Sequence, residues 1–521
     1  MNALAKPMNG AESLIATLVA SNVDVAFTNP GTSEMHFVAA LGRVEGMRAI
    51  LCLFEGAVTG MADGYGRMKK TPAATLLHLG PGLAYGLPNL HNARRASSPI
   101  VNIVGDHATY HAQYDAPLTS DVAGIARPVS SWVHTSISAK TVGVDGARAV
   151  QAARAAPGQI ATLILPADTA WNEGSGLAGP LPVAGPAPVG GRAVDEAAQL
   201  LRNGKRTAIL LRGAALEAEG LEIAGRIKAG SGARIMCDTI APRLTRGAGI
   251  VAVERVPYFA EQIVDYFRDI EQLILVGTKP PVSFFAYPGK PSWCLPEGCM
   301  IHYLAHAHED GVSALEALAG AIDAPRQPAD RVASALPEAP QGRLNAYTIG
   351  QAIGRFLPEN AIVADEAATS ALGTLKFTAA AARHDHLGLT GGSLGQGIPL
   401  ASGAAVACPD RKVVCLQGDG GAMYTIQALW TQARENLDVT TVIFNNRAYG
   451  ILRVELARVG AENPGPSSLS LLDLTNPELD WVSLGRSMGV ESSRATTAEE
   501  FADQFASAMK SRGPRLIEAV M

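Results

Sequence analysis

The sequence of 521 residues predicts an α/β protein built from three doubly wound parallel-sheet domains. Short apolar runs of strand length alternate with stretches of helical periodicity, and this alternation is typical of βαβ units. Two stretches rich in Pro and Gly, residues 173–192 and 324–343, carry few large apolar side chains and are typical of linkers. We therefore expect an N-terminal domain over residues 1–172, a central domain over 190–325 and a C-terminal domain over 344–521.

Composition and charge narrow the class of protein. Hydrophobic residues make up 47% of the chain and charged residues 17%, which supplies large cores and is unlike a disordered chain. The net charge of -5 gives no sign of a nucleic-acid or membrane surface, so we expect neither partner. No secretory signal is visible, and no uninterrupted apolar run reaches the ~18 residues that span a bilayer. With six cysteines and no CxxC pair, a cytoplasmic protein is the expectation.

Two neighbouring strands of the C-terminal domain are each followed by polar residues. The apolar run 413–416 leads to Gly418-Asp419-Gly420, and the run 439–444 leads to Asn445-Asn446. Ligands of parallel sheets bind at the carboxyl ends of strands, so Asp419 and Asn446 should lie at one edge. Carboxylate and amide oxygens suit Mg²⁺, although each short motif could also be a plain surface turn.

This pair of segments resembles the GDG and NN motif of thiamine diphosphate (ThDP)-dependent enzymes. The resemblance implies that ThDP binds through Mg²⁺, with Asp419, Asn446 and the carbonyl of Ala448 as metal ligands. Further cofactor contacts are implied for Gly418, Gly420, Gly421, Tyr449, Gly450 and Ile451.

A second segment, residues 51–67, reads LCLFEGAVTGMADGYGR. We predict a strand that ends at Glu55 and a helix of small residues after it. The segment resembles the one in ThDP enzymes whose Glu hydrogen-bonds the aminopyrimidine ring. The resemblance implies that Glu55 favours the imino tautomer and so activates the thiazolium carbon of the cofactor. The alternative is a carboxylate that only faces a helix dipole.

Three loops resemble the remaining parts of this active site. Asn29-Pro30-Gly31-Thr32 is similar to the N-P-G-S loop that borders it, and His78 begins a glycine turn that lies near the thiazolium ring. Gly391-Gly392-Ser393-Leu394-Gly395 is similar to the loop that wedges the cofactor into a bent shape, with Leu394 as the wedge. Without its position before the GDG segment, Leu394 would be assigned to the core.

The substrate pocket resembles that of benzoylformate decarboxylases in part. His78 matches their N-terminal histidine, and Thr32 stands for their serine, which holds the substrate carboxylate. Their second histidine is missing, since Phe284-Phe285-Ala286 occupies that place. Leu452 and Glu455 follow the metal segment, and Glu455 replaces a pocket phenylalanine, which argues against benzoylformate itself.

His107 and His111 follow the predicted strand 100–104 and should end at the same ligand edge. Proton transfer is one role for them. Two histidines four residues apart on a helix could instead bind a metal, or simply be solvated.

Acetolactate synthases offer a rival comparison. Residues 121–128 resemble their D-V-x-G-I-T-R-P segment, but Pro117-Leu118 replaces the preceding Phe-Gln. Their FAD signature is absent after residue 277, where Thr278-Lys279-Pro280-Pro281 stands instead. A FAD-free carboligase is therefore an alternative, and a non-catalytic ThDP-binding protein is a third, which the intact Glu55 argues against.

The resemblance covers the chain end to end and implies a ThDP- and Mg²⁺-dependent 2-oxo acid decarboxylase or carboligase. A C2 ylide would add to the keto group, CO₂ would leave, and the enamine would be protonated to an aldehyde or ligated to an acyloin. His78 would be the proton shuttle or a substrate contact. Since Glu55 reaches cofactor held mainly by the partner subunit in such enzymes, a homodimer or homotetramer is implied.

Overall fold

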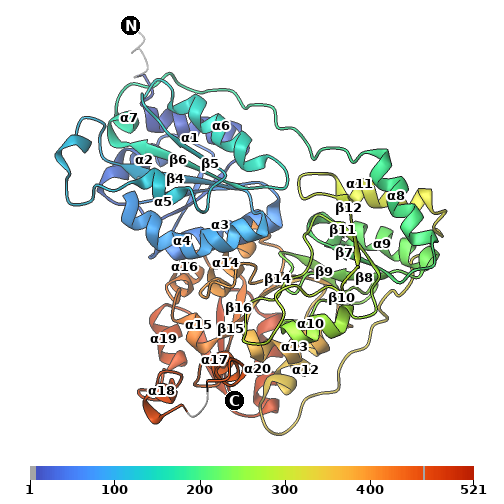
Figure 1. Cartoon of the computed structure of the whole chain (residues 1–521). Coiled ribbons are helices and arrows are strands. Elements are labelled where there is room, and N and C mark those ends of the chain that lie inside the picture. The colour runs from blue at the N-terminus through green and yellow to red at the C-terminus, as the bar shows by residue number, and fades with distance from the viewer. Residues whose placement is uncertain (1–6, 462–463) are drawn as a thin grey trace.

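The computed structural model describes residues 7–461 and 464–521 and contains three α/β domains. In Figure 1 the N-terminal domain lies at the top, the central domain at the right and the C-terminal domain at the bottom. Each domain has its own sheet, and all strand pairs but one are parallel in the described part of the chain. The predicted fold of three parallel α/β sheets is confirmed.

The N-terminal sheet has six strands in the order β2-β1-β3-β4-β6-β5. Its strands are β1 (Val25–Thr28), β2 (Arg48–Leu51), β3 (Ala73–Leu77), β4 (Ile100–Asp106), β5 (Trp132–Thr135) and β6 (Ile160–Pro166). Its helices are α1 (Gly10–Ala20), α2 (Met35–Leu41), α3 (Glu55–Lys69), α4 (Leu79–Ala96), α5 (Val122–Ala126), α6 (Val142–Arg154) and α7 (Ala167–Trp171). Every residue of β3 and β6 is buried, as expected for parallel strands covered on both faces.

The central sheet has five strands in the order β10-β8-β7-β11-β12. Its strands are β7 (Thr207–Leu211), β8 (Arg234–Cys237), β10 (Glu254–Arg255), β11 (Gln272–Val276) and β12 (Met300–Ala305). Its helices are α8 (Gly191–Arg202), α9 (Ala218–Ser231), α10 (Ala260–Phe267) and α11 (Gly311–Ala321).

The C-terminal sheet has seven strands in the order β17-β18-β16-β15-β13-β14-β9. Its strands are β9 (Leu244–Arg246), β13 (Ala361–Glu366), β14 (His384–Gly388), β15 (Val413–Gly418), β16 (Val439–Asn445), β17 (Glu491–Ala495) and β18 (Arg515–Val520). Its helices are α12 (Ala346–Phe356), α13 (Leu372–Phe377), α14 (Gly397–Ala407), α15 (Asp419–Ala422), α16 (Ala428–Arg434), α17 (Gly450–Arg458), α18 (Pro466–Ser470), α19 (Trp481–Ser487) and α20 (Ala498–Lys510). Strand β9 belongs to the central segment of the sequence and pairs antiparallel with β14, so it joins these two domains.

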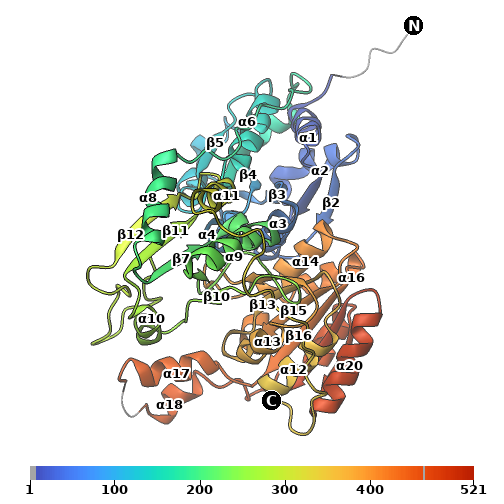
Figure 2. The same cartoon turned by 90° about the vertical axis from the view of Figure 1, so that its right-hand side faces the viewer.

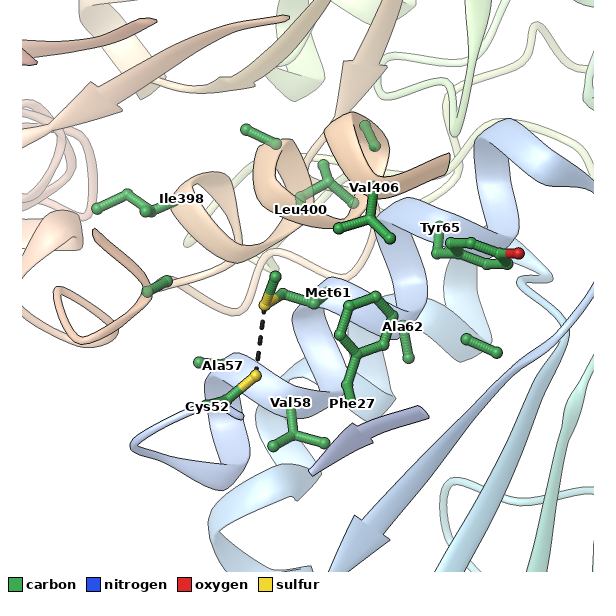
Figure 3. Close-up of a cluster of buried hydrophobic side chains, with 14 of the residues drawn as sticks. Phe27, Cys52, Ala57, Val58, Met61, Ala62, Tyr65, Ile398, Leu400 and Val406 are labelled. Carbon is green, nitrogen blue, oxygen red and sulfur yellow. Dashed lines mark hydrogen bonds between the residues drawn. The ribbon is translucent and has the colours of Figure 1, made fainter. Parts of the chain in front are cut away.

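Helix α3 packs between the N-terminal sheet and helix α14 of the C-terminal domain. Its small residues leave room for a close approach, and its residues are buried from Glu55 to Met68. Figure 3 shows Met61 and Tyr65 of α3 beside Phe27 on one side and Leu400 on the other. The first and last domains therefore share one hydrophobic core.

Helix α17 reaches from the C-terminal domain to the central domain (Figure 2). Arg458 at its end pairs with Glu261 of α10, with a shortest N to O distance of 2.6 Å. Over the described residues, no helix is both long and apolar enough to cross a membrane.

Candidate functional site

Glu55 is the first residue of helix α3 and not the end of a strand, so that part of the prediction was wrong. Strand β2 ends at Leu51, which is paired with Thr28, the last residue of β1. Because β1 offers no further partner, the chain leaves the sheet and turns into α3 with Phe54 as the extended N-cap. The Glu55 side chain is buried, with 8% of the residue exposed.

His78 forms the centre of a small acid–base cluster at the carboxyl edge of the N-terminal sheet. It directly follows β3, and its Nδ1 lies 2.8 Å from Oε2 of Glu34. The same Oε2 accepts the N–H of Gly31 at 2.8 Å. A Cβ added to Gly82 would lie 3.0 Å from Oε1 of Glu55 and 3.3 Å from Cβ of His78, so both side chains approach this glycine closely. The structure thus brings Glu55 and His78 together.

Glu34 is a member of this cluster that the sequence did not identify. It is 2% exposed, and burial raises the pKa of its carboxyl, while the neighbouring His78 acts to lower it. It ends the short 3₁₀ helix Thr32–Glu34, which places it beneath the exposed Thr32. The only sequence feature that could have identified Glu34 was its position five residues after Asn29, just beyond the predicted loop.

His107 and His111 follow β4, the strand next to β3, at the same carboxyl edge. Their ring centroids are 5.3 Å apart, but His107 lies in the loop directly after β4 and His111 on the following turn, so they do not share a helix. Nε2 of His107 is buried without a hydrogen-bond partner. Across residues 7–461 and 464–521, no group of three or more His, Cys, Asp or Glu side chains is arranged to hold a metal.

At the C-terminal sheet, the two predicted metal ligands lie at one edge. Strands β15 and β16 are adjacent, with Gly418 paired to Phe444, so Asp419 and Asn446 follow neighbouring strands. Asp419 is 3% exposed, and burial raises the pKa of its carboxyl. Its oxygens accept the N–H groups of Gly420 at 2.8 Å and Arg447 at 2.7 Å.

Asn446 and the residues after it complete this edge. The side-chain oxygen of Asn446 accepts the N–H of Ala448 at 3.0 Å. Tyr449 is the N-cap of α17, which Gly450 and Ile451 open. One carboxylate, one amide oxygen and nearby carbonyls form the kind of mixed oxygen donor set that Mg²⁺ accepts, so the residues present fit a diphosphate-bound Mg²⁺.

The loop that carries Leu394 is anchored by Glu366, a second residue that the sequence did not identify. Glu366 is the buried last residue of β13, and its carboxylate accepts the N–H of Gly395 at 2.6 Å and that of Gly397. Burial raises the pKa of Glu366 to about 7. Its signal was an acidic residue at the end of an apolar strand.

Helix α4 holds the other side of this loop. Asn92 donates to the carbonyl of Ser393 at 2.8 Å. Asn89 donates both to the carbonyl of Gly395 at 3.2 Å and to that of Gly56 at 2.8 Å. One side chain therefore links the loop of Leu394 to the first turn of α3, where Glu55 lies.

An aromatic side chain of the central domain packs against the same loop. Gly392 has a positive φ of 70°, and a Cβ there would be 2.9 Å from the ring of Phe284. Phe284 belongs to the segment in which benzoylformate decarboxylases would place a second histidine, and its ring neighbours are Tyr258 and Phe285. This part of the site is therefore apolar.

Glu455 of α17 faces the same aromatic group. Burial and the negative charge of Glu455 raise the pKa of Tyr258, and they raise that of Tyr287 to about 12. Leu452 on the same helix is exposed.

Within the described parts of the chain, no hydrogen bond or ion pair joins Glu55 or His78 to Asp419 or Asn446.

Family patterns match both ends of the chain. Residues 8–125 match the "Thiamine pyrophosphate enzyme, N-terminal TPP binding domain", and residues 371–519 match the corresponding C-terminal TPP binding domain. Thiamine pyrophosphate is another name for ThDP. The first match contains Glu55 and His78, and the second contains Leu394, Asp419 and Asn446.

Two curated relatives span almost the whole chain. A Mycobacterium tuberculosis (H37Rv) protein, provisionally named acetolactate synthase large subunit IlvX, is 52% identical over 515 residues, which cover 99% of both chains. The benzoylformate decarboxylase of Pseudomonas aeruginosa is 28% identical and covers 94% of this chain and 95% of its own.

Solved structures share the fold. The ThDP-dependent 4-hydroxybenzoylformate decarboxylase of Rhodococcus jostii RHA1 superposes with a TM-score of 0.85 at 23% identity, over 98% of this chain and 99% of its own. The benzoylformate decarboxylase of Polynucleobacter necessarius gives a TM-score of 0.82 at 21% identity, over 99% of this chain and 98% of its own.

Proposed function

The chain belongs to the thiamine pyrophosphate enzymes, in the group of acetolactate synthases and benzoylformate decarboxylases, and we propose that it decarboxylates a 2-oxo acid with ThDP and Mg²⁺. The product is an aldehyde, or an acyloin when the remaining unit joins a second carbonyl. The observation that carries this proposal is the cluster of Glu55, His78 and Glu34, which places a buried carboxylate beside an oriented imidazole.

The C-terminal edge would hold the cofactor. Asp419, Asn446 and the carbonyl of Ala448 would bind Mg²⁺, and the glycines around Asp419 leave the backbone accessible to a diphosphate. When bound, ThDP supplies the carbon nucleophile and the electron sink that decarboxylation needs. Leu394 would support the cofactor from the loop that Glu366 and Asn92 hold in place.

Glu55 would hold a proton against the aminopyrimidine ring. Its place at the start of α3 fixes the side chain within a nearly solvent-free core, where a carboxylate interacts strongly with a nearby ring nitrogen. This function would account for a buried carboxylate at the start of a helix of mostly small residues.

His78 would move a proton to or from the reacting substrate through its Nε2. In this role Nδ1 would donate its hydrogen to Glu34, 2.8 Å away, which would fix the tautomer and leave Nε2 for the substrate. The exposed hydroxyl of Thr32, beside Glu34, would bind the substrate carboxylate. His107 and His111 lie at the same edge and would be additional proton-transfer groups.

A second copy of the chain would complete the site. Large apolar side chains are exposed beside both edges: Leu53 and Tyr85 lie near Glu55, and Met423 and Tyr424 follow the metal segment. Exposed apolar groups at a functional edge are typical of subunit interfaces. We propose a homodimer, or a homotetramer made of such dimers.

A FAD-free carboligase of the acetolactate synthase type is the second candidate. The relative that is 52% identical carries that name, and this supports ligation of two oxo acids as the main outcome. Glu455 lies beside Tyr287, and a charged side chain in this pocket would disfavour a benzoyl ring.

Product analysis with ThDP, Mg²⁺ and a panel of 2-oxo acids, with and without an aldehyde acceptor, tests the proposal. CO₂ with free aldehyde indicates a decarboxylase, whereas an acyloin or acetohydroxy acid indicates a carboligase. Both activities should be lost in Glu55→Gln and kept in Glu45→Gln, an exposed site for the same substitution. Bound ThDP without turnover of any acid would favour a non-catalytic ThDP-binding protein.

A further inference from the structure

A cavity of about 320 Å³ lies between the central and C-terminal domains. Residues around β8 and β9 line one side, and residues of α13 and β14 line the other. None of the residues assigned above to the cofactor or the substrate lines it. The cavity therefore needs an explanation of its own.

Three cations contribute to its wall: Arg246, Arg255 and Lys376. None of them forms an ion pair with any residue that the structure describes. Arg246 donates to the carbonyl of Leu375 at 2.7 Å, and Arg255 donates to that of Thr239. Lys376 lies over the rings of Tyr347 and Phe377.

The single carboxylate in the wall does not neutralise these cations. Asp238 is engaged elsewhere, because it pairs with Arg212 and accepts the hydroxyl of Thr278. Burial and the repulsion of Arg255 lower the pKa of Arg246 to about 10, against the weaker opposing effects of Cys237 and Asp365. The pKa of His386, also in the wall, is lowered by burial and, more weakly, by both arginines, against the opposing effect of Asp365. Arg255 and Lys376 are exposed, whereas Arg246 is half-buried and has no ion-paired carboxylate among the described residues. A half-buried guanidinium is unfavourable without an anion.

The rest of the wall is mostly apolar, with side chains such as Ile240, Leu244, Ile250 and Val251. A volume of about 320 Å³ is at the lower end of the range that holds small organic ligands. A ligand that satisfies both features has one anionic group and a short apolar body.

We propose that this cavity is a binding site for a small amphiphilic anion, a carboxylate or phosphate monoester on a short apolar chain, with Arg246 and Arg255 at the anionic group. The site lies on β14, whose residues His386 and Gly388 line it. Three residues after Gly388, the same segment becomes the loop of Gly391 to Gly395. A ligand there contacts the strand that leads into the cofactor loop, so the position suits an effector.

Calorimetric titration of the full-length protein, kept in ThDP and Mg²⁺, tests this site with hexanoate, hexyl phosphate, inorganic phosphate and 1-hexanol. At least one hexyl anion should bind, and inorganic phosphate and 1-hexanol should bind at least about tenfold more weakly. Arg255→Gln should weaken binding of the hexyl anion at least about tenfold, and Arg246→Gln should do the same.

Arg192→Gln is the matched control, because Arg192 lies on the outer surface of the same domain with a side chain 92% exposed. It should leave the affinity unchanged. Arg255 is exposed at the rim, so its substitution should not disturb folding, which circular dichroism checks. Failure of both hexyl anions to bind would overturn the proposal. Equal binding of 1-hexanol, or equal affinities in Arg255→Gln and Arg192→Gln, would also overturn it.

Discussion

The carboxyl edges of the N-terminal and C-terminal sheets hold their acidic side chains differently. At the N-terminal edge, Glu34 meets the ring of His78, and Glu55 lies nearby. At the C-terminal edge, Asp419 and Glu366 each accept two backbone N–H groups. Two backbone N–H groups hold each C-terminal carboxylate in one position, whereas a carboxylate paired with an imidazole can take part in proton transfer. This difference supports our proposal that the first edge moves protons and the second binds the cofactor.

Glu55→Gln should break the N-terminal function with the largest effect. We expect turnover to fall about 10²–10⁴-fold, the range that general acid–base groups contribute. The affinity for ThDP should change less than about threefold, because the diphosphate is held at the other edge. Steady-state rates and fluorescence titration with ThDP check both results. Glu45→Gln should keep wild-type rates, and a similar loss there would contradict the assignment.

Asp419→Ala should break the C-terminal function instead. Loss of the buried carboxylate should weaken Mg²⁺-dependent ThDP binding by about 10–100-fold, the range seen for groups that support metal sites. Excess ThDP and Mg²⁺ should then restore part of the turnover, which they should not do for Glu55→Gln. Calorimetry at several Mg²⁺ concentrations gives the measurement. An unchanged ThDP affinity would show that Asp419 does not hold the metal.

Glu34→Gln tests the proposed role of His78 and should have a smaller effect on turnover. Glutamine can still accept one hydrogen bond, but the charge that stabilises the imidazolium is lost. We expect kcat to fall about tenfold and its pH profile to change, while KM and ThDP affinity stay near wild type. His78→Ala and the double variant provide the control, because Glu34→Gln should have little further effect without His78. Independent, multiplicative losses would refute the pairing.

Substitution of Glu366 should change how the stability of the protein depends on pH. Of the four substituted sites, it should have the smallest effect on turnover. The pKa of Glu366, about 7 in the folded protein, lies above the ordinary value of 4.5, so the folded state binds the proton more tightly. Its contribution is thus fully favourable below about pH 4.5 and is lost as the pH rises through about 7.

When the pH rises from 5 to 8, the free energy of unfolding of the wild type should fall by about 2–3 kcal/mol relative to that of Glu366→Gln. Denaturant unfolding of both proteins at the two pH values measures this difference. Parallel changes in the two proteins would show that Glu366 does not titrate in this range.

Much of the fold and the C-terminal edge could be predicted from local sequence. The apolar runs before Asp419 and Asn446 became adjacent parallel strands, β15 and β16, because their patterns and lengths are strong signals. Strand β9 could not be predicted. It is three residues long, and its pairing with β14 depends on how the central segment meets another domain.

The N-terminal edge was harder to predict because it depends on tertiary contacts. Glu34 meets His78 across 44 positions in the sequence, and no local pattern encodes that distance. Glu55 begins a helix because β1 ends and leaves β2 without a partner strand. His107 and His111 lie in a loop and a turn that their spacing did not predict. Phe284 reaches Gly392 only after the central domain has docked.

The most direct test of the division between the two edges is the exchange of the C2 proton of bound ThDP in D₂O, followed by quenched-flow NMR for wild type and Glu55→Gln. We predict that the variant binds ThDP as the wild type does but exchanges this proton at least about 10²-fold more slowly. Wild-type exchange in Glu55→Gln, with cofactor bound, would contradict the central claim that Glu55 activates ThDP.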